Sequence, residues 1–232
     1  MNLWLSLNSG QGDAAFNMAM DEALLEAASR LQKPVLRFYG WTEPAATFGY
    51  FQKFPNVERA TLLRPLIRRP TGGGIVPHDA DWTYSFAAPP GHEWHSLAAI
   101  ESYRRIHEWI QGAFTKLKIQ TDLAPDKKAS SASPDLPGEC FTGHEKFDLL
   151  WHGKKIAGAA QRRNKLGLLI QGSVQPPPVP IERVTWEKAM LATASETFSL
   201  QWQPLPPDED LLARAAELAR QKYAKTAYNM KC

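Results

Sequence analysis

Short segments with the alternating or continuous hydrophobicity of β-strands are spread along the chain. They span residues 3–7, 35–39, 45–49, 82–87, 147–151, 154–157 and 167–174, and residues 75–76 add a shorter one. His152-Gly153 separates two of these segments, so we expect a tight hairpin turn between them.

Other segments carry apolar residues at the three- and four-residue spacing of helices. One helix is predicted after Asp13 and a second after Ser96, since both residues are suitable N-caps. Further helices are predicted at residues 186–194 and after Asp208. Strand pairs mixed with helices around one core favour a single domain of the α/β (α+β) class.

The composition narrows the class of protein. Of the 232 residues 44% are hydrophobic, which is enough for one sizeable core, and the net charge of +3 does not indicate nucleic-acid binding. No apolar run approaches the roughly 20 residues that span a bilayer, and the first residues lack a signal-peptide pattern. Cys140 and Cys232 are far apart, so we expect a cytoplasmic protein without a disulfide framework. No metal is expected, because no pair of Cys or His residues has zinc-ligand spacing beside a second pair.

A basic and glycine-rich segment is the first candidate for chemistry. It contains Arg68, Arg69, Thr71, Gly72, Gly73 and Gly74, and it ends in His78-Asp79. Successive glycines can adopt positive φ and let backbone N–H groups approach a ligand, and guanidinium groups nearby suit a carboxylate, a phosphate or an oxyanion. The alternative is a flexible loop beside a basic surface pair. His78 and Asp79 could position a ligand, transfer a proton or close a turn.

Two further features could carry chemistry. Cys140 follows a polar loop and precedes a strand, where exposed catalytic residues tend to lie, although many free cysteines are buried and structural. Lys154 and Lys155 are expected on opposite faces of a strand, so one can face a pocket while the other faces solvent. Gly158-Ala159 then removes bulk where a ligand could lie against the backbone. The alternative for the lysine pair is a solvated hairpin surface.

Four ordered stretches of the chain resemble the biotin/lipoate protein ligase family, and within it the lipoate branch. Residues 17–25 resemble the first helix of the family, and residues 36–52 resemble the hairpin that follows it. Residues 68–79 resemble its acyl-binding glycine loop, and residues 153–160 with 171–174 resemble its lysine strand and the next strand. Cys140-Phe141 and Lys155, 15 positions after the cysteine, are similar to the pattern of the cysteine-dependent octanoyltransferases of this branch.

The resemblance implies one catalytic domain over residues 1–232, with the core motifs in 3–174, a C-terminal helical part in 181–232 and no accessory domain. It also implies a mixed, mostly antiparallel sheet with packed helices, similar to biotin synthetases and class II aminoacyl-tRNA synthetases. The implied activity is octanoyl transfer from acyl carrier protein to a lipoyl-domain lysine. The acceptor would be a protein such as the glycine-cleavage H protein or a 2-oxoacid dehydrogenase E2 subunit. Neither a cofactor, a nucleic acid nor a membrane is expected to take part.

The same resemblance implies a role for each candidate residue. Cys140 would form the thioester, and Lys155 would position it and favour its thiolate, because a nearby ammonium lowers the pKa of a thiol. The acyl group would bind against Arg69, Thr71, Gly72, Gly73, Gly74, His78, Gly158 and Ala159.

Two other functions stay open at this point. The triple glycine is the ligase-like form of the loop, where the transferases usually have Gly-Gly-Arg, and Pro77 replaces a large apolar residue. The second possibility is therefore an ATP-dependent lipoate–protein ligase, which would need ATP and Mg and would lack or borrow its accessory domain. A third is a non-catalytic protein that binds lipoyl domains or acyl groups.

Overall fold

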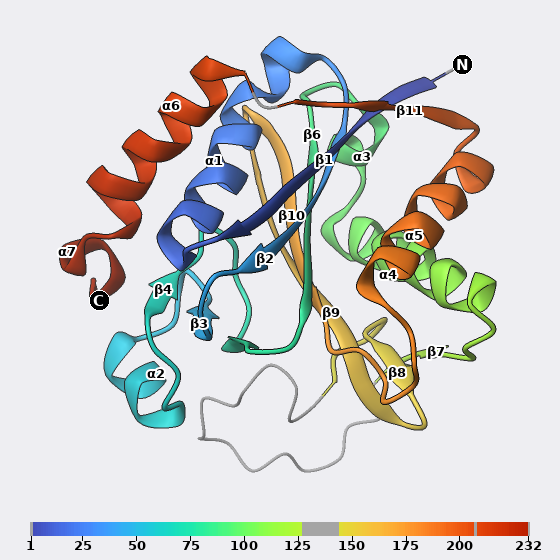
Figure 1. Cartoon of the computed structure of the whole chain (residues 1–232), viewed down its shortest axis with the longest axis horizontal. Coiled ribbons are helices and arrows are strands. Elements are labelled where there is room, and N and C mark those ends of the chain that lie inside the picture. The colour runs from blue at the N-terminus through green and yellow to red at the C-terminus, as the bar shows by residue number, and fades with distance from the viewer. Residues whose placement is uncertain (1, 127–143, 207, 232) are drawn as a thin grey trace.

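A mixed eight-stranded sheet forms the centre of the computed structural model, which describes residues 2–126, 144–206 and 208–231 (Figure 1). In spatial order its strands are β11 (Leu200–Pro204), β1 (Asn2–Gly12), β2 (Val35–Trp41), β6 (Trp82–Ala88), β10 (Gly167–Val174), β9 (Lys154–Asn164), β8 (Leu149–Trp151) and β7 (Asp122–Leu123). Strands β11, β1 and β2 run parallel to one another, and every other neighbouring pair in this sheet is antiparallel. The mixed, mostly antiparallel α/β architecture expected from the sequence is confirmed.

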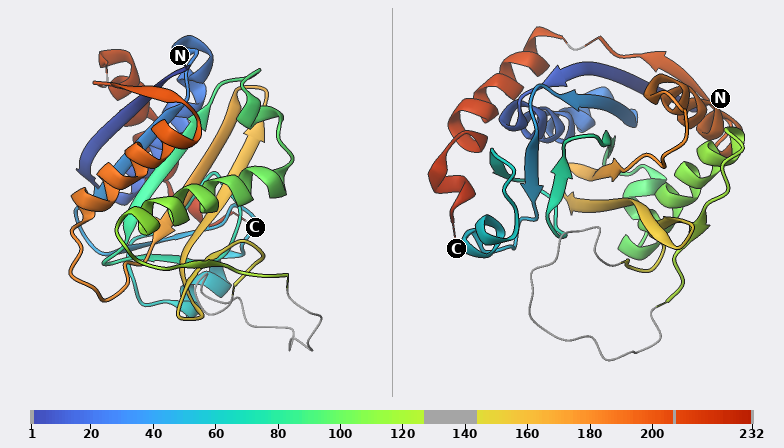
Figure 2. Two further views of the ribbon diagram at one scale, coloured as in Figure 1. Left: turned by 90° about the vertical axis from the view of Figure 1, so that its right-hand side faces the viewer. Right: turned by 60° about the horizontal axis from the view of Figure 1, so that its bottom comes forward.

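Helices cover both faces of this sheet (Figures 1 and 2). One face carries α3 (Glu93–Ser96), α4 (Ala99–Lys116) and α5 (Arg183–Thr197). The other carries α1 (Ala14–Leu31) and α6 (Glu209–Leu218), which continues into a π-helical turn (Ala219–Tyr223) and α7 (Thr226–Asn229). The core under α4 and α5 is rich in aromatic rings: Trp4 is buried and packs against Phe86 and Trp109, with ring centroids 5.3 and 6.0 Å away. Such rings bury large apolar areas and dominate the energetics of a core.

A second, three-stranded sheet lies beside α1 and consists of β4 (Leu66–Arg68), β3 (Ala45–Phe48) and β5 (Val76–His78), with α2 (Phe54–Ala60) packed on it. The hairpin expected over residues 36–52 is therefore wrong. Strand β2 pairs with β1 on one edge and β6 on the other, so it has no free edge for β3. Strand β3 pairs instead with β4 and β5.

The two predicted N-caps have different outcomes. Asp13 caps α1 as expected, and its carboxylate accepts a hydrogen bond from the N–H of Phe16 at 2.8 Å. Ser96 does not cap α4. Its own N–H already bonds to the carbonyl of His92, so it ends the short helix α3, and the N-cap of α4 is Ala98.

A buried ion pair joins α1 to the sheet. Arg37 of β2 and Asp21 of α1 lie 2.7 Å apart, and both side chains are fully buried. The guanidinium also donates to Asn17 and to the hydroxyl of Ser9. Asp21 accepts further hydrogen bonds from Ser85, Tyr39 and Gln171, which come from β6, β2 and β10. The pair is thus surrounded by donors and acceptors, as a buried charge requires.

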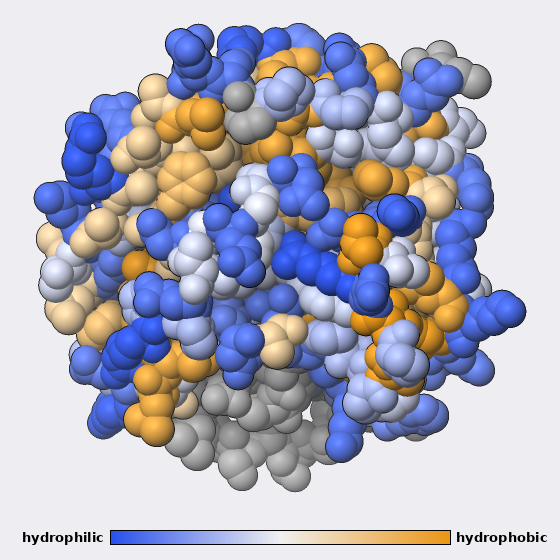
Figure 3. All heavy atoms as spheres, in the orientation of Figure 1, coloured by the Kyte–Doolittle hydropathy of each residue, from blue (hydrophilic) through white to orange (hydrophobic). Residues whose placement is uncertain are grey.

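The helices and the hydropathy of the surface bear on a possible membrane location. Within residues 2–126, 144–206 and 208–231 no helix is long and apolar enough to cross a bilayer. On the face seen in Figure 3, hydrophilic and hydrophobic residues are intermixed.

We expect Arg37→Met to lower the free energy of unfolding by about 3–5 kcal/mol, because it leaves the Asp21 charge buried without its partner. Urea denaturation of both proteins measures this difference. Arg30→Met is the matched control, since the Arg30–Asp208 pair is exposed and such pairs contribute only about 0–1 kcal/mol. Equal losses in the two variants would contradict the importance of the buried pair.

A second expectation concerns pH. Burial lowers the pKa of His107 in α4 to about 4, against about 6.5 in an unfolded chain. As pH falls below 6.5, the unfolded chain takes up a proton that the folded chain does not, so folding becomes less favourable. We expect this histidine to remove roughly 3 kcal/mol of stability between pH 7 and pH 4.

Denaturation of His107→Gln across this pH range checks the expectation, because the variant should lose this part of the pH dependence. His152→Asn changes an exposed histidine and should keep it. Parallel stability curves for wild type and His107→Gln would contradict the assignment.

Candidate active site

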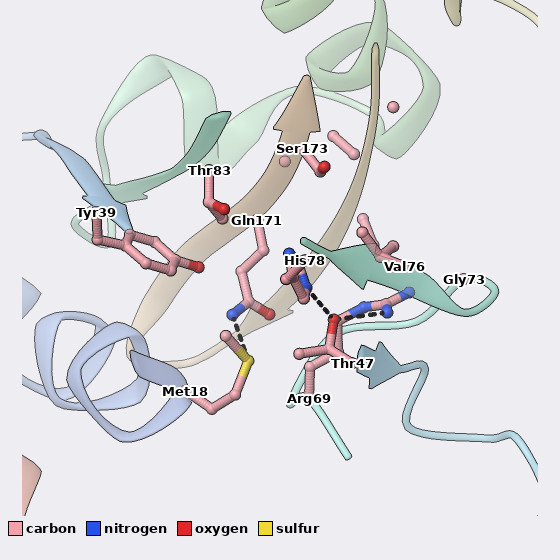
Figure 4. A pocket seen from close by; sticks show the side chains of 14 residues that line it. Met18, Tyr39, Thr47, Arg69, Gly73, Val76, His78, Thr83, Gln171 and Ser173 are labelled. Atoms are coloured by element: carbon pink, nitrogen blue, oxygen red, sulfur yellow. Dashed lines mark hydrogen bonds between the residues drawn. The ribbon is translucent and has the colours of Figure 1, made fainter. Parts of the chain in front are cut away.

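A pocket opens between the large sheet and the small one (Figure 4). About 440 Å³ of space in it is not filled by protein atoms, and this volume includes the open mouth of the pocket. Its lining consists of Met18, Tyr39, Thr47, Arg69, Gly73, Val76, His78, Thr83, Gly158, Ala159, Ala160, Gln171, Gly172 and Ser173. Apolar atoms make up most of this lining, so the pocket suits an apolar ligand.

The large sheet supplies one wall of the pocket through two cross-strand rows of residues. The first row, across β2, β6, β10 and β9, consists of Tyr39, Thr83, Ser173 and Gly158. The second row, two residues along the same strands, consists of Arg37, Ser85, Gln171 and Ala160. Asp21 binds three members of the second row, so the polar network around Asp21 covers part of this row. Gln171 and Ala160 of the second row line the pocket. The first row contributes all four of its residues to the pocket lining.

The glycine loop covers the pocket from the side of the small sheet. Arg69 holds this loop, because its Nε donates to the carbonyl of Gly72 at 3.0 Å and its Nη2 to the carbonyl of Gly74 at 2.8 Å. Of the three glycines Gly73 has a positive φ, +86°, and its carbonyl lies so close to Gly49 that a Cβ there would be 2.0 Å away. The use of loop N–H groups as oxyanion donors stays a prediction.

Four other residues of this segment are not among those that line the pocket. Arg68 does not line the pocket, since its guanidinium donates to the carbonyls of Tyr50 and Gln52. Thr71 is buried behind the loop and donates to Gln171 Oε1 at 2.8 Å, which ties the loop to the polar network. Gly72 and Gly74 hold the loop through Arg69 and are not among the lining residues.

His78 is fixed from two sides in the wall of the pocket. Its Nδ1 lies 2.9 Å from Asp81 and its Nε2 lies 2.8 Å from the Thr47 hydroxyl, while Trp41 stacks on the ring. Burial raises the pKa of Asp81, but the charge of His78 and hydrogen bonds to the carboxylate outweigh this, so the pKa lies below its ordinary value. Asp79, the neighbour singled out in the sequence, is exposed, and Asp81 takes the place beside the histidine.

Lys155 reaches the edge of the pocket as half of a second buried ion pair. Its Nζ lies 2.7 Å from Asp148 Oδ2, and the two side chains are 5% and 0% exposed. Asp148 also accepts hydrogen bonds from the Tyr103 hydroxyl and from the N–H of Glu145. The ammonium lies against Gly158, where an added Cβ would come within 2.9 Å of Nζ. Gly158 therefore makes room for the lysine as well as lining the pocket.

A β-bulge explains why Lys155 points this way. Leu150 of β8 pairs with Lys155, but its neighbour Leu149 pairs with Ala157, so β9 contains one extra residue between them. A bulge of this kind re-aims the side chains on one side of it. Lys155 and Gly158 consequently reach the same side of the sheet, while Lys154 is exposed as the strand pattern predicts.

The structure thus brings together most of the residues that the sequence singled out. Arg69, Gly73, His78, Gly158 and Ala159 line one pocket, and Lys155 lies at its edge. Cys140 lies outside the described residues. Within the described parts of the chain no group of three or more His, Cys, Asp or Glu residues could hold a metal ion.

Several contributors were not predicted from the sequence. Asp148 binds Lys155 directly, and Tyr103 supports this contact by donating a hydrogen bond to Asp148. Asp148 lies in a loop and Tyr103 in the distant helix α4. Gln171 and Ser173 were noted as part of a strand and not as pocket residues. The sequence does contain a signal for them, because polar residues two positions apart lie on the same face of a strand. Thr83 and Ser85 have this spacing in β6, and Gln171 and Ser173 have it in β10, both of which are buried strands.

Comparison with known proteins identifies relatives of this chain. The model of the lipoyl protein ligase A/B catalytic domain matches residues 13–175. Octanoyltransferase LipM of Halalkalibacterium halodurans is 35% identical over 182 residues, which cover 75% of this chain and 66% of the relative. Octanoyltransferase LipM of Bacillus subtilis is 36% identical over 181 residues, covering 74% and 64%. The chain spans just under two thirds of the length of these relatives.

Solved structures share the fold at lower sequence identity. A crystal structure of lipoate-protein ligase A bound with ATP matches with a TM-score of 0.77 and 22% identity, covering 99% of both chains. Protein Ta0514 of T. acidophilum with bound lipoic acid matches with a TM-score of 0.79 and 22% identity, again over 99% of both chains. The sequence match to the family model and to the curated relatives shows that the chain belongs to the lipoyl protein ligase A/B catalytic-domain family.

Proposed function

We propose that this chain is an octanoyltransferase, which moves an octanoyl group from acyl carrier protein, through a thioester on Cys140, to a lysine of a lipoyl-domain protein. One observation carries the proposal: an apolar pocket has the buried ammonium of Lys155 at its edge, against Gly158. The octanoyltransferase relatives support the acyl group, and a protein of this fold binds lipoic acid. A bipartite lipoate protein ligase of similar fold acts with an E2 lipoyl domain, which supports the class of acceptor.

The first step forms the enzyme thioester. Cys140 attacks the carbonyl carbon of the donor thioester, the bond to the carrier sulfur breaks, and the carrier thiol leaves with the proton that Cys140 gave up. Only the thiolate is nucleophilic, and a cation nearby increases its population. Lys155 is the cation that we assign to this role, because Asp148 holds it at the edge of the pocket.

The second step forms the amide. The acceptor lysine attacks as a neutral amine at the acyl carbon, the carbon–sulfur bond breaks, and Cys140 recovers as a thiol the proton that the amine loses. During both steps the acyl chain stays in the pocket, with its reacting end toward Gly158. The pocket thereby holds the acyl group in place while the group passes from the carrier thiol to Cys140 and then to the acceptor amine. Such positioning lowers the barrier to each step.

A second candidate function is ATP-dependent lipoate–protein ligation. The triple glycine Gly72-Gly73-Gly74 favours it as the ligase-like form of the loop, and a ligase of this fold binds ATP. Lys155 would then hold an acyl-adenylate, and Cys140 would be structural.

Intact-protein mass spectrometry tests the two candidates directly. We expect wild type mixed with octanoyl acyl carrier protein to gain one octanoyl group that hydroxylamine removes, and Cys140→Ala to gain none. Addition of an apo lipoyl domain should then move the group to its lysine. If wild type shows no adduct, and the domain is modified only with ATP and free acid, the transferase proposal fails and the ligase replaces it.

Asp148→Asn tests the role of the buried pair. We expect the rate of octanoyl transfer to fall by at least about tenfold, the equivalent of 1.4 kcal/mol, because the lysine loses the charge that holds it beside Gly158. Initial rates by mass spectrometry give the comparison, and thermal melts show whether the variant is folded. Asp122→Asn is the matched control, since this carboxylate is exposed on β7 beside β8. A folded Asp148→Asn with the wild-type rate would remove Asp148 from the site.

A further inference from the structure

The side chains of Tyr39, Gln171 and Met18 close the end of the pocket that lies away from Gly158. Gly158 belongs to β9, whereas α1 packs over β10, β6 and β2 and brings Met18 to Gln171. Tyr39 stands at the opposite end of the first row from Gly158. In Figure 4 Tyr39 and Met18 lie on one side of the Gln171 side chain, and Gly73 and Val76 lie on the other.

Two of these three side chains are locked by the buried network. The Tyr39 hydroxyl donates to Asp21 at 3.0 Å, and the Arg37 guanidinium lies 3.9 Å from the centre of its ring. Gln171 donates to Asp21 at 2.7 Å with its amide nitrogen and accepts from Thr71 with its oxygen. Moving either one would leave a buried polar group without its partner, which is costly.

Met18 is the adaptable member of the three. It is 2% exposed, its side chain is unbranched and apolar, and its sulfur accepts a weak hydrogen bond from Gln171 at 3.3 Å. Methionine fills irregular gaps and can adopt several rotamers at small cost. A change of volume at this position alters the space at the end of the pocket while the polar network stays in place.

We propose that Met18 sets the length of the acyl chain that the pocket accepts, and this inference rests on the acyl transfer proposed above. With the reacting end of the chain at Gly158, its terminal methyl group approaches Met18. Each further methylene group beyond the available space must displace the Met18 side chain, since Tyr39 and Gln171 hold their positions. The site therefore selects straight acyl chains of medium length.

The experiment compares hexanoate, octanoate, decanoate and dodecanoate. Isothermal titration gives the affinity of each free acid, and transfer from the matching acyl carrier proteins gives kcat/KM. For Met18→Ala we expect the preference for decanoate over octanoate to rise about tenfold or more. One extra methylene group in an apolar pocket typically changes specificity by at least about that factor. For Met18→Phe, in which a larger ring fills the end of the pocket, we expect a comparable shift toward hexanoate.

Met20→Ala is the matched control. Met20 lies on the same helix and is equally buried, but it does not line the pocket. Loss of packing in this variant should lower stability and leave the ratio between chain lengths unchanged. Because the ratio is measured within one protein, a general loss of folded protein does not alter it.

The outcomes separate this inference from the proposed function. If wild type binds octanoate and Met18→Ala shifts the preference, the inference holds even when no transfer from carrier protein is found, and the transferase proposal alone fails. If transfer occurs but the ratio in Met18→Ala equals that of wild type and Met20→Ala, Met18 does not set the length. Failure of wild type both to bind any of the four acids and to transfer any of the four acyl groups would overturn the inference as well.

Discussion

The buried ion pair between Arg37 and Asp21 is the constraint on which the rest of the structure depends. A charge in the interior must be paired and hydrogen-bonded, since the cost of leaving it alone exceeds the gain from most single contacts. The partners of this pair come from helix α1 and from strands β1, β2, β6 and β10. A shift of α1 along the sheet would break several of these buried hydrogen bonds at once, so the network stabilises this placement of the helix over the strands beneath it.

The pocket follows from that placement. The network around Asp21 binds three of the four residues of one cross-strand row, of which Gln171 and Ala160 reach the pocket, whereas all four residues of the neighbouring row, from Tyr39 to Gly158, line it. Thr71 carries the network into the glycine loop through its hydrogen bond to Gln171, so the cover of the pocket is tied to its floor. A rigid polar floor and a loop fastened to it give the apolar space between them a defined shape.

The parts that could be predicted from the sequence are those whose cause is local. The range of β10, the N-cap at Asp13 and the turn at His152-Gly153 depend on neighbouring residues, and all three are confirmed. The predicted pairing of β3 with β2 was wrong. Whether β2 has a free edge depends on the distant strands β1 and β6, which pair with it on both sides.

The same distinction applies to the candidate site. Resemblance to a family identified Lys155 and the glycine loop, because they lie in recognisable motifs. Tyr103 could not be identified in this way, since it is an ordinary helix residue whose importance comes from its neighbour in space. Met18 lies in the helix motif of residues 17–25, but the resemblance gave it no role, and its place at the pocket depends on its contact with Gln171. Asp148 lies only seven positions before Lys155, but a bulge in β9 is needed to bring the two together, and no local pattern announces it.

The Arg37–Asp21 and Lys155–Asp148 ion pairs are best explained by different causes. Replacement of a buried pair by well-packed apolar residues is often neutral or stabilising, so stability alone is a weak reason for a charge in the interior. The Arg37–Asp21 pair has many partners in the core and connects elements far apart in the sequence, so specification of the fold accounts for it. The Lys155–Asp148 pair lies at the edge of a pocket, on a bulge, against a glycine that leaves it room. Each of those features weakens packing, and the proposed function accounts for them, because it requires the ammonium at a fixed position beside the acyl group.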